Sequence, residues 1–388
     1  MTKIFHEAVV EIIDSKDKLQ EALLGEPMTI KLGFDPSSPN LHIGHYITLR
    51  QLKYFMDLGH KVVFVIGDFT GMIGDPTGRN KARLPLNAEQ VKENAQTYFD
   101  QVGMVLDTGK IEVRYNSEWL NKIDLSEWLK ILSSFSVNSL IERDDFQKRL
   151  TENATVGLHE LMYPPLQAYD SVALEANLEV GGTDQTFNLL AGRELQKKLG
   201  QQPQFVLIIE LLVGTDGVKK MSKSIGNTID LIDTPEDKYG KTMSLPDEAV
   251  EQYCRLVLEK SLDELKSVAG SDHPMALKKT LAHGIVEIFH PGEGDKAAEN
   301  FERVVSKGEM PEEVNEVTID ANSTASLKDV LVANNLVASG SQVQRLAEQG
   351  SIKADGKALT KDEVLGPLAL DSGTVIQYGK RQFVKLIK

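Results

Sequence analysis

Apolar residues in the first two hundred positions occur as short runs separated by longer segments of mixed polarity. Five runs have the length and composition of buried strands, and they are Met28–Phe34, Lys61–Gly67, Ile111–Tyr115, Leu178–Val180 and Phe205–Leu212. The segments between them have helical spacing around residues 41–58, 87–102, 126–150 and 186–199. Strands that alternate with helices predict an α/β fold, in which a parallel, Rossmann-like sheet is covered by helices on both faces.

The pattern changes after Pro235. Residues 235–313 are helical and charged, without strand-like runs, and residues 309–323 contain Pro311 and few large apolar side chains, which predicts a linker. Two short helices and then strands follow, up to Ile387. We therefore expect a Rossmann-like domain at residues 1–230, an α-helical domain at 231–322 and a small α+β domain at 323–388.

Composition narrows the class of protein. The chain has 388 residues, which is too long for one ordinary core. It has no apolar run near 18 residues and no basic-then-apolar amino terminus, so we expect a cytoplasmic protein without a membrane span. The single cysteine, Cys254, excludes an internal disulfide and a cysteine-rich zinc site.

Charge is distributed unevenly along the chain. The formal net charge is −14, but residues 326–388 contain nine Lys or Arg against six Asp or Glu, a net +3. Phosphate contacts require Lys and Arg, so this asymmetry is typical of a protein that binds a polyanion locally and repels it elsewhere.

Three polar segments fall at the carboxyl ends of predicted strands. They are Gly33-Phe34-Asp35-Pro36, Gly67-Asp68-Phe69-Thr70-Gly71 and Gly181-Gly182-Thr183-Asp184-Gln185. Ligands of parallel sheets bind at this edge, so these segments are the candidate pocket.

Two further motifs point to ATP. In His42-Ile43-Gly44-His45 the histidines lie three apart at the start of a helix, near its positive end, and Gly44 has no side chain to hinder an adenine ring. In Lys220-Met221-Ser222-Lys223-Ser224 two lysines occupy a polar loop from which they can reach a triphosphate. Either motif alone is more often a packed or solvated surface feature. Both together, in this order, are the ATP-binding signatures of class I aminoacyl-tRNA synthetases.

The chemistry of that class explains these residue types. An amino-acid carboxylate attacks the α-phosphate of ATP and needs no general base. Catalysis then consists of placing the two substrates and stabilising charge on phosphate oxygens, which histidine and lysine side chains can do.

The chain resembles the bacterial tyrosyl-tRNA synthetases over essentially its whole length. The segments that carry the resemblance are 33–36, 42–45, 71–78, 166–170, 181–185 and 220–224. It implies an ATP-dependent ligase that makes tyrosyl-adenylate and transfers tyrosine to the terminal ribose of tRNA(Tyr). It also implies Mg²⁺ bound with ATP, no dedicated metal site, a homodimer, and a last domain similar to an RNA-binding module of a ribosomal small-subunit protein.

The resemblance assigns roles residue by residue. Those around tyrosine would be Asp75, Tyr163 and Gln167 at the α-amino group, Asp170 at the phenolic hydroxyl and Gln185 at the carboxylate. Those around ATP would be His42, His45, Lys220 and Lys223 as catalytic residues, with Gly44, Thr48, Gly181, Gly182, Asp184, Ser222 and Ser224 as binding residues and Arg79 and Arg83 as a pyrophosphate loop. The chain departs at Lys31, where many members have a tyrosine that contacts the substrate hydroxyl; we expect Lys31 to be a surface residue.

Three alternatives stay open from the residues. A nucleotidyltransferase that adenylates a small metabolite would share the histidine motif, but it would need neither the lysine loop nor the basic carboxyl-terminal segment. A catalytically silent RNA-binding paralogue is disfavoured by intact motifs. Tryptophan as the substrate is disfavoured by Gln167-Ala168-Tyr169-Asp170.

Overall fold

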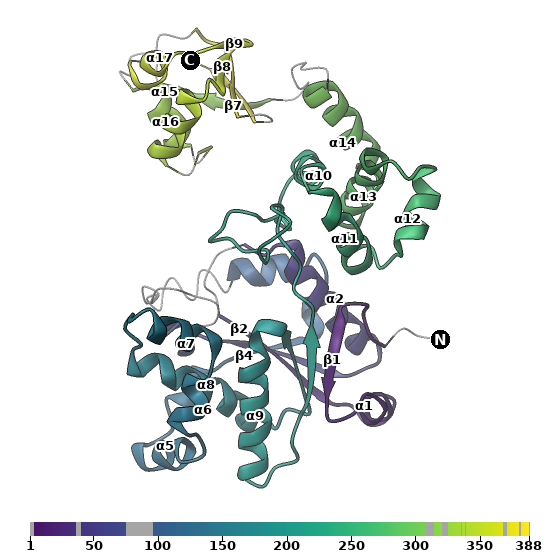
Figure 1. Ribbon diagram of the computed structural model, residues 1–388, viewed down its shortest axis with the longest axis vertical. Helices are drawn as coiled ribbons and strands as arrows, with labels where there is room; N and C mark the ends of the chain where they lie inside the picture. Colours follow the sequence, from purple (N-terminus) through teal and green to yellow (C-terminus); the bar gives the residue numbers. More distant parts are fainter. Residues whose placement is uncertain are drawn as a thin grey trace. The chain divides into compact units, whose positions relative to one another are not determined.

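A computed structural model describes residues 4–35, 40–74, 96–306, 314–319, 325–334, 336–337, 339–367, 371–379 and 382–387. The chain divides into two compact units (Figure 1). The first comprises Met1–Thr234 and Lys241–Pro291, and the second comprises Pro235–Gly240 and Gly292–Lys388. This division is coarser than the three expected domains, whose boundaries at 230 and 322 stay a prediction.

The first unit is built on a six-stranded sheet of order β1-β6-β5-β2-β3-β4. Its strands are β1 (Val9–Ile13), β2 (Thr29–Phe34), β3 (Lys61–Ile66), β4 (Ile111–Tyr115), β5 (Leu178–Gly182) and β6 (Phe205–Ile209). Strands β2 to β6 are parallel, as predicted, and β1 pairs antiparallel with β6 at one edge. The sequence pattern missed β1, because an edge strand that is only partly buried lacks a continuous apolar run.

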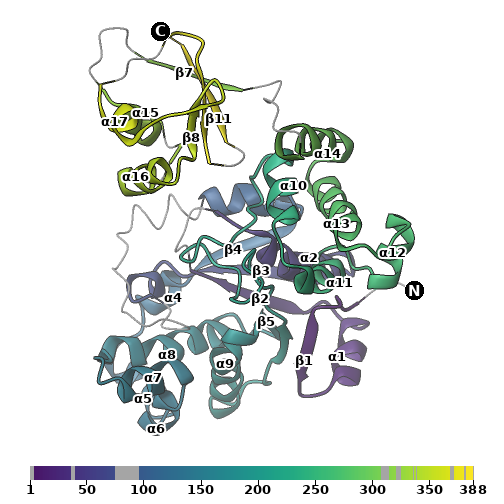
Figure 2. The same ribbon diagram turned by 45° about the horizontal axis from the view of Figure 1, so that its top comes forward.

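Helices cover both faces of this sheet (Figure 2). On one face α1 (Lys16–Leu23), α2 (Ile43–Asp57) and the helical residues 96–102 share a core with Val62 and Phe64 of β3. On the other face α4 (Ser117–Leu120) and α8 (Leu158–Ala173) pack on Val63 and Val65, and α9 (Thr186–Lys198) packs on β6. A strand buried on both sides explains why β3 is apolar from Val62 to Ile66, after the exposed Lys61.

The shorter helices of this unit include α5 (Leu125–Leu132), α6 (Val137–Ile141) and α7 (Asp144–Thr151), with 3₁₀ turns at Thr70–Met72, Thr108–Lys110, Thr183–Gln185 and Asp247–Ala249. The sequence pattern missed α8, which contains Pro164 and Pro165, residues that usually end a helix.

Helices follow the sheet, as predicted. They are α10 (Pro235–Met243), α11 (Val250–Val257), α12 (Leu262–Ala269), α13 (Pro274–Phe289) and α14 (Gly294–Phe301), continued by a π-helical turn at Glu302–Ser306. Tyr253 and Leu256 of α11 and Leu281 of α13 belong to the same buried cluster as Leu52 of α2. Helices α11 to α13 are therefore joined to the first unit by a continuous core.

The carboxyl-terminal part of the second unit has its own core and a five-stranded sheet of order β7-β11-β10-β8-β9. Its elements are β7 (Asn315–Thr318), α15 (Leu327–Ala333), α16 (Gly340–Glu348), β8 (Ile352–Ala354), β9 (Lys357–Ala358), α17 (Lys361–Leu365), β10 (Val375–Tyr378) and β11 (Phe383–Ile387). The prediction of a linker at 309–323 is wrong for β7, which pairs parallel with β11 and buries Val317.

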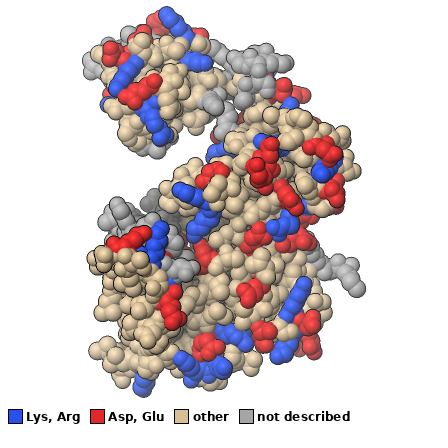
Figure 3. Space-filling model, in the orientation of Figure 1, with Lys and Arg blue, Asp and Glu red and all other residues tan. Residues whose placement is uncertain are grey.

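Acidic and basic side chains are interspersed over the visible surface (Figure 3). Among the described helices, none has the length and apolar character that crossing a membrane requires.

Candidate active site

A cavity of about 360 Å³ opens at the carboxyl ends of β2 and β5 in the first unit. All three predicted strand-end segments contribute to its walls, together with the start of α2, one side of α8 and the loop that follows β6. Thirteen of the predicted site residues line it: His42, Gly44, His45, Thr48, Tyr163, Gln167, Asp170, Gly181, Gly182, Asp184, Gln185, Lys220 and Ser222.

Five predicted site residues are not among the lining residues. Lys223 and Ser224 belong to the same loop as Lys220 but do not line the cavity. Asp75, Arg79 and Arg83 lie outside the described residues. The individual roles of all eighteen stay predictions, although the cavity does bring most of them together.

The histidine motif lies where α2 begins. His42 is the extended residue that precedes the helix, and its main-chain N–H donates to Nδ1 of His45 over 3.1 Å. A neutral His45 therefore carries its proton on Nε2, the nitrogen that can donate to a substrate oxygen. A β-carbon on Gly44 would stand 3.0 Å from the His42 ring, so the glycine gives that ring room.

Both histidines are electrically neutral at neutral pH. Removal from water lowers the pKa of His42 well below its usual value, and the nearby His45 and lysines lower it further. Burial is also the main cause that lowers the pKa of His45, to about 4. These rings can hydrogen-bond phosphate oxygens, but the positive charge at this end of the cavity comes from lysines.

The lysine loop is held in shape by Asn227, which the sequence analysis did not single out. Its Oδ1 accepts the main-chain N–H of Ser222 at 2.8 Å, and its Nδ2 donates to the carbonyl of Lys220 at 3.2 Å. Asn227 Nδ2 also donates to Asp216 Oδ2 at 3.0 Å, and nothing in the local sequence marks this asparagine as the centre of these contacts.

Each lysine of the motif is paired with a carboxylate. Lys220 Nζ lies 2.6 Å from Asp184 Oδ2, and Lys223 pairs with Asp230. The carbonyl of Ile229, beside Asp230, accepts the N–H of Ile43 at 2.9 Å. The loop is thereby tied to the first turn of α2, which brings both ATP motifs to one place.

The other end of the cavity holds a buried carboxylate, Asp170, whose residue is 3% exposed. Its Oδ1 accepts the indole N–H of Trp119 at 2.8 Å, and Asn116 Nδ2 lies 3.5 Å from its Oδ2. Burial raises the pKa of Asp170 to about 7, against the opposing charge of Lys31 and these hydrogen bonds. The sequence analysis missed Trp119 and Asn116; their position just after β4 was the available signal, since ligands bind at strand ends.

Tyr163 points its hydroxyl at Asp35, a residue of the first strand-end segment. The hydroxyl donates to Asp35 Oδ2 at 2.8 Å, and Thr70 Oγ1 donates to Asp35 Oδ1 at 3.1 Å. Asn116 in turn donates to Thr70 Oγ1 at 3.0 Å. Asp35 therefore connects both sides of the cavity, a role that the sequence pattern did not reveal.

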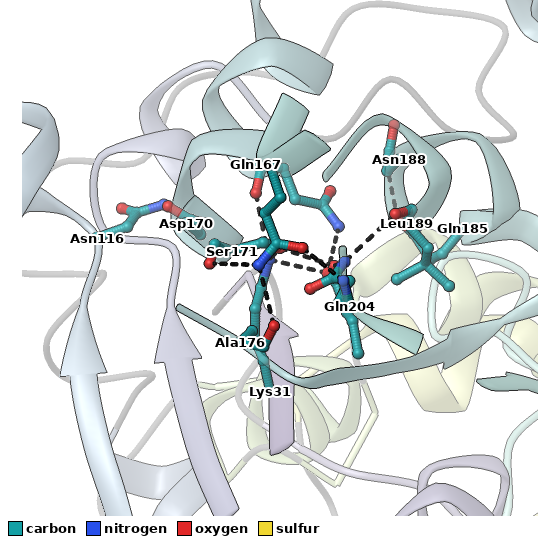
Figure 4. A network of polar contacts seen from close by, with 12 residues as sticks. Lys31, Asn116, Gln167, Asp170, Ser171, Ala176, Gln185, Asn188, Leu189 and Gln204 are labelled. Carbon is teal, nitrogen blue, oxygen red and sulfur yellow. Dashed lines mark hydrogen bonds and ion pairs between the residues drawn. The ribbon is translucent and has the colours of Figure 1, made fainter. Parts of the chain in front are cut away.

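Gln185 is oriented by the helix that follows it. Asn188 Nδ2 donates to Gln185 Oε1 at 2.8 Å, and Arg143 donates to Asn188 Oδ1 at 3.0 Å (Figure 4 shows the bond between Asn188 and Gln185). Since the Gln185 oxygen accepts, its NH₂ group is the part suited to bind a carboxylate.

Lys31 is not a surface residue, so that prediction is wrong. Its side chain is fully buried, and its Nζ lies 2.9 Å from Glu179 Oε1, 2.9 Å from Ser171 Oγ and 3.2 Å from the carbonyl of Gln167 (Figure 4). The reason is the sheet: β2 is central and covered on both faces, so every one of its middle side chains is buried.

Known proteins resemble this chain over most of its length. Residues 24–305 match the family model described as tRNA synthetases class I (W and Y). The chain is 43% identical to the tyrosine–tRNA ligase of Oleidesulfovibrio alaskensis, with 97% of this chain and 96% of that one covered. It is 41% identical to the tyrosine–tRNA ligase of Aquifex aeolicus, with 99% and 98% covered.

A solved structure shares the fold. The tyrosyl-tRNA synthetase of Archaeoglobus fulgidus, complexed with L-tyrosine, has a TM-score of 0.60 and 22% identity over 75% of this chain and 96% of that one. The family model covers most of the chain, and the two ligases match the chain almost from end to end. The chain thus belongs to the class I tRNA synthetases, in the family of the tyrosine–tRNA ligases.

Proposed function

We propose that this chain is a tyrosine–tRNA ligase that works through the residues around the cavity. The observation that carries the proposal is one cavity lined by two different sets of groups. One set contains the buried carboxylate of Asp170, and the other contains the neutral histidines with Lys220. A phenol and a nucleotide triphosphate are the chemical groups that match these two sets.

In the first step a tyrosine carboxylate oxygen attacks the α-phosphorus of ATP, the bond to the bridging oxygen of the β-phosphate breaks, and pyrophosphate leaves. His45 Nε2–H donates to a phosphate oxygen, and Lys220 and Lys223 exchange their carboxylate partners for phosphate. Asp184, released from Lys220, accepts from the ribose hydroxyls. Mg²⁺ enters with ATP as part of this substrate, and phosphate oxygens are its main ligands.

Tyrosine is recognised at three points. Its phenolic hydroxyl donates to Asp170, its ammonium group lies near Tyr163, Gln167 and the predicted Asp75, and its carboxylate accepts from the NH₂ of Gln185. A site built around a hydroxyl rejects an analogue that lacks it by about 10⁴ to 10⁵, a factor known for tyrosyl-tRNA synthetases as such and not a result of this geometry.

In the second step a terminal ribose hydroxyl of tRNA attacks the carbonyl carbon of tyrosyl-adenylate, and AMP leaves. We assign tRNA binding to the carboxyl-terminal part of the second unit. There Arg345, Lys353 and Lys357 form no ion pair with a carboxylate within the described part of the chain, although Lys357 acts on Glu363 at longer range, so their charges are available for phosphates.

A homodimer is the expected assembly of this ligase. An apolar groove of about 420 Å³ in the first unit is lined by nine residues, among them Leu125, Trp128 and Met162. Leu125 and Leu129, one turn apart on α5, are 73% and 58% exposed. We propose that a second copy of the chain covers this face, because exposed apolar patches of this kind mark protein interfaces.

The test is ATP–pyrophosphate exchange with each amino acid in turn and with small-metabolite acids. Tyrosine alone should support exchange, and tRNA(Tyr) should then become charged. Exchange with tryptophan or a metabolite instead of tyrosine would point to one of the alternative enzymes, and no exchange with any acid would point to a silent paralogue.

A further inference from the structure

A fully buried ion pair lies directly behind the cavity. Lys31 of β2 and Glu179 of β5 have side chains that are 0% and 1% exposed, and their charged atoms are 2.9 Å apart. The ammonium group also contacts Ser171 Oγ at 2.9 Å and the carbonyl of Gln167 at 3.2 Å, which uses its three donors. Every hydrogen of this charge therefore has an acceptor.

Glu179 is equally well surrounded. Its Oε2 accepts from Gln204 Nε2 at 2.6 Å and from Ser171 Oγ at 3.0 Å, and Gln167 Nε2 lies 3.5 Å from its Oε1. Glu179 also lines the cavity, as Gln167 does. Glu179 thus reaches the wall of the cavity, and Lys31 lies one contact behind it.

The pair holds one side of α8 at two points. Its partners Gln167 and Ser171 are four residues apart, so they lie on one side of the helix, and Asp170 is between them in the sequence. A movement of this turn would move the Asp170 carboxylate and the Gln167 amide together. Lys31 and Glu179 therefore control where both predicted tyrosine-binding groups stand.

The pair also sets the charge around Asp170. The charged groups that act on it are Lys31 from β2 and Glu179 from β5, while Trp119 and Asn116 face it with neutral donors. The ammonium of Lys31 lowers the pKa of Asp170 more than the carboxylate of Glu179 raises it. Without Lys31 the carboxyl would remain protonated to a higher pH.

A purely structural role does not explain an ion pair at this place. Well-packed apolar residues of the same volume usually serve a core as well or better, because burying two charges costs as much as their attraction returns. We propose that Lys31 and Glu179 are positioning residues for tyrosine specificity, which hold Gln167 and Asp170 in place and keep the Asp170 carboxylate an acceptor for the phenolic hydroxyl. This inference rests on the proposed function.

The experiment compares full-length variants in tyrosine-dependent pyrophosphate exchange. Lys31→Met removes the ammonium, and Lys31→Met/Glu179→Gln removes both charges at nearly constant volume. The matched control is Arg149→Met/Glu160→Gln, a second buried ion pair that contacts α8 at Glu160, away from Asp170. For each variant KM and kcat for tyrosine, phenylalanine and ATP are measured between pH 5.5 and 9.

Both Lys31 variants should raise the KM for tyrosine severalfold at pH 7, because Asp170 loses the ammonium group that favours its ionised form, and should leave the KM for ATP within about twofold. The midpoint of the pH dependence should move to higher pH, and the preference for tyrosine over phenylalanine should shrink. The control variant should match the wild type in all three readouts.

Some outcomes would overturn the inference. They are an unchanged KM for tyrosine and an unchanged pH midpoint in the double variant, or an equal loss in the Arg149 and Glu160 control. If Lys31→Met fails to fold, the double variant still tests the inference, because it leaves neither Lys31 nor Glu179 as an unpaired buried charge. A wild-type protein without tyrosine-dependent exchange would instead contradict the proposed function itself.

Discussion

The ammonium group of Lys220 lies 2.6 Å from the carboxylate of Asp184, so two residues predicted to bind ATP form an ion pair with each other. If Lys220 binds the triphosphate as predicted, phosphate oxygens replace this carboxylate at the lysine. Neither Lys220 nor Asp184 is a hydrogen-bond partner of Asp170, which contacts Asn116 and Trp119 instead, so loss of the lysine should leave the Asp170 carboxylate in place.

Lys220→Ala and His45→Ala should therefore lower kcat for adenylate formation by roughly 10² to 10³ while tyrosine affinity changes little, because both side chains act on charge that develops in the transition state. Pre-steady-state rates and tyrosine Kd values measure the two effects separately. Thr280→Ala serves as a control, because Thr280 belongs to α13 and does not line the cavity. A tyrosine Kd that weakened in step with kcat would contradict these roles.

Asp170→Ala should abolish most of the discrimination between tyrosine and phenylalanine, since it removes the acceptor for the hydroxyl that phenylalanine lacks. The loss should fall on kcat/KM for tyrosine, and phenylalanine should change much less. Tyr163→Phe is the control, because it removes the bond to Asp35 and leaves Asp170 in place. Equal losses for both amino acids would mean that Asp170 acts on something other than the phenol.

Tyrosine binding should strengthen as the pH rises through about 7, the pKa to which burial raises Asp170, because the ionised carboxylate is a stronger acceptor for the phenol than the protonated carboxyl is. Both histidines are already neutral in this range. The raised pKa of Asp170 also affects folding, but it makes the folded state less stable as the pH rises. A carboxyl whose pKa is raised in the folded state contributes stability that is fully present below about pH 4 and is lost as the pH rises through 7.

Calorimetric titration with tyrosine and thermal unfolding at several pH values measure the two effects. Asp170→Asn should flatten both profiles near pH 7. A wild-type binding curve that stayed level from pH 6 to 8 would show that this carboxyl does not titrate there.

Arg345→Ala/Lys353→Ala/Lys357→Ala should reduce tRNA charging and leave pyrophosphate exchange unchanged, since these residues belong to the second unit and the cavity lies in the first. Each lost phosphate contact should also lower the slope of log Kd against log salt by about 0.7 to 0.9. The control is Lys361→Ala/Lys385→Ala, whose lysines pair with Glu348 and Glu316. Undiminished charging would place the tRNA contact elsewhere.

Leu125→Glu/Leu129→Glu should convert a dimer into a monomer, because charges on the proposed face cannot be buried without partners. Sedimentation velocity measures the change. Val268→Glu on α12, where another apolar side chain is 68% exposed, is the control and should keep the assembly of the wild type. If the leucine variant sediments as the wild type does, this face is not the interface.

Much of the fold followed from the apolar pattern, because strands buried on both faces leave continuous apolar runs. The apolar pattern failed where packing against the rest of the fold overrides the local preference of the sequence. Helix α8 continues through Pro164 and Pro165, and β7 is too short and exposed to leave a run, although β11 pairs with it.

The cavity was predictable where motifs mark it and unpredictable where long-range partners build it. His42 and Lys220 belong to recognisable motifs that the fold brings to one cavity. Trp119, Asn116 and Asp35 have only their positions after strands as a local signal, and their roles depend on side chains far away in the sequence. Lys31 was mispredicted for the same reason. A single lysine in a strand is expected to be exposed unless its buried partner, here Glu179, is known.

The bond between Lys31 and Glu179 also bears on how this family can change over evolutionary time. A single replacement of either residue leaves a buried charge without its counterion, at a cost of about 3–5 kcal/mol. That is a large share of the 5–15 kcal/mol by which proteins of this kind are stable. Exchange of the lysine should therefore be tolerated best when the glutamate changes with it, and we expect the two positions to vary together among relatives.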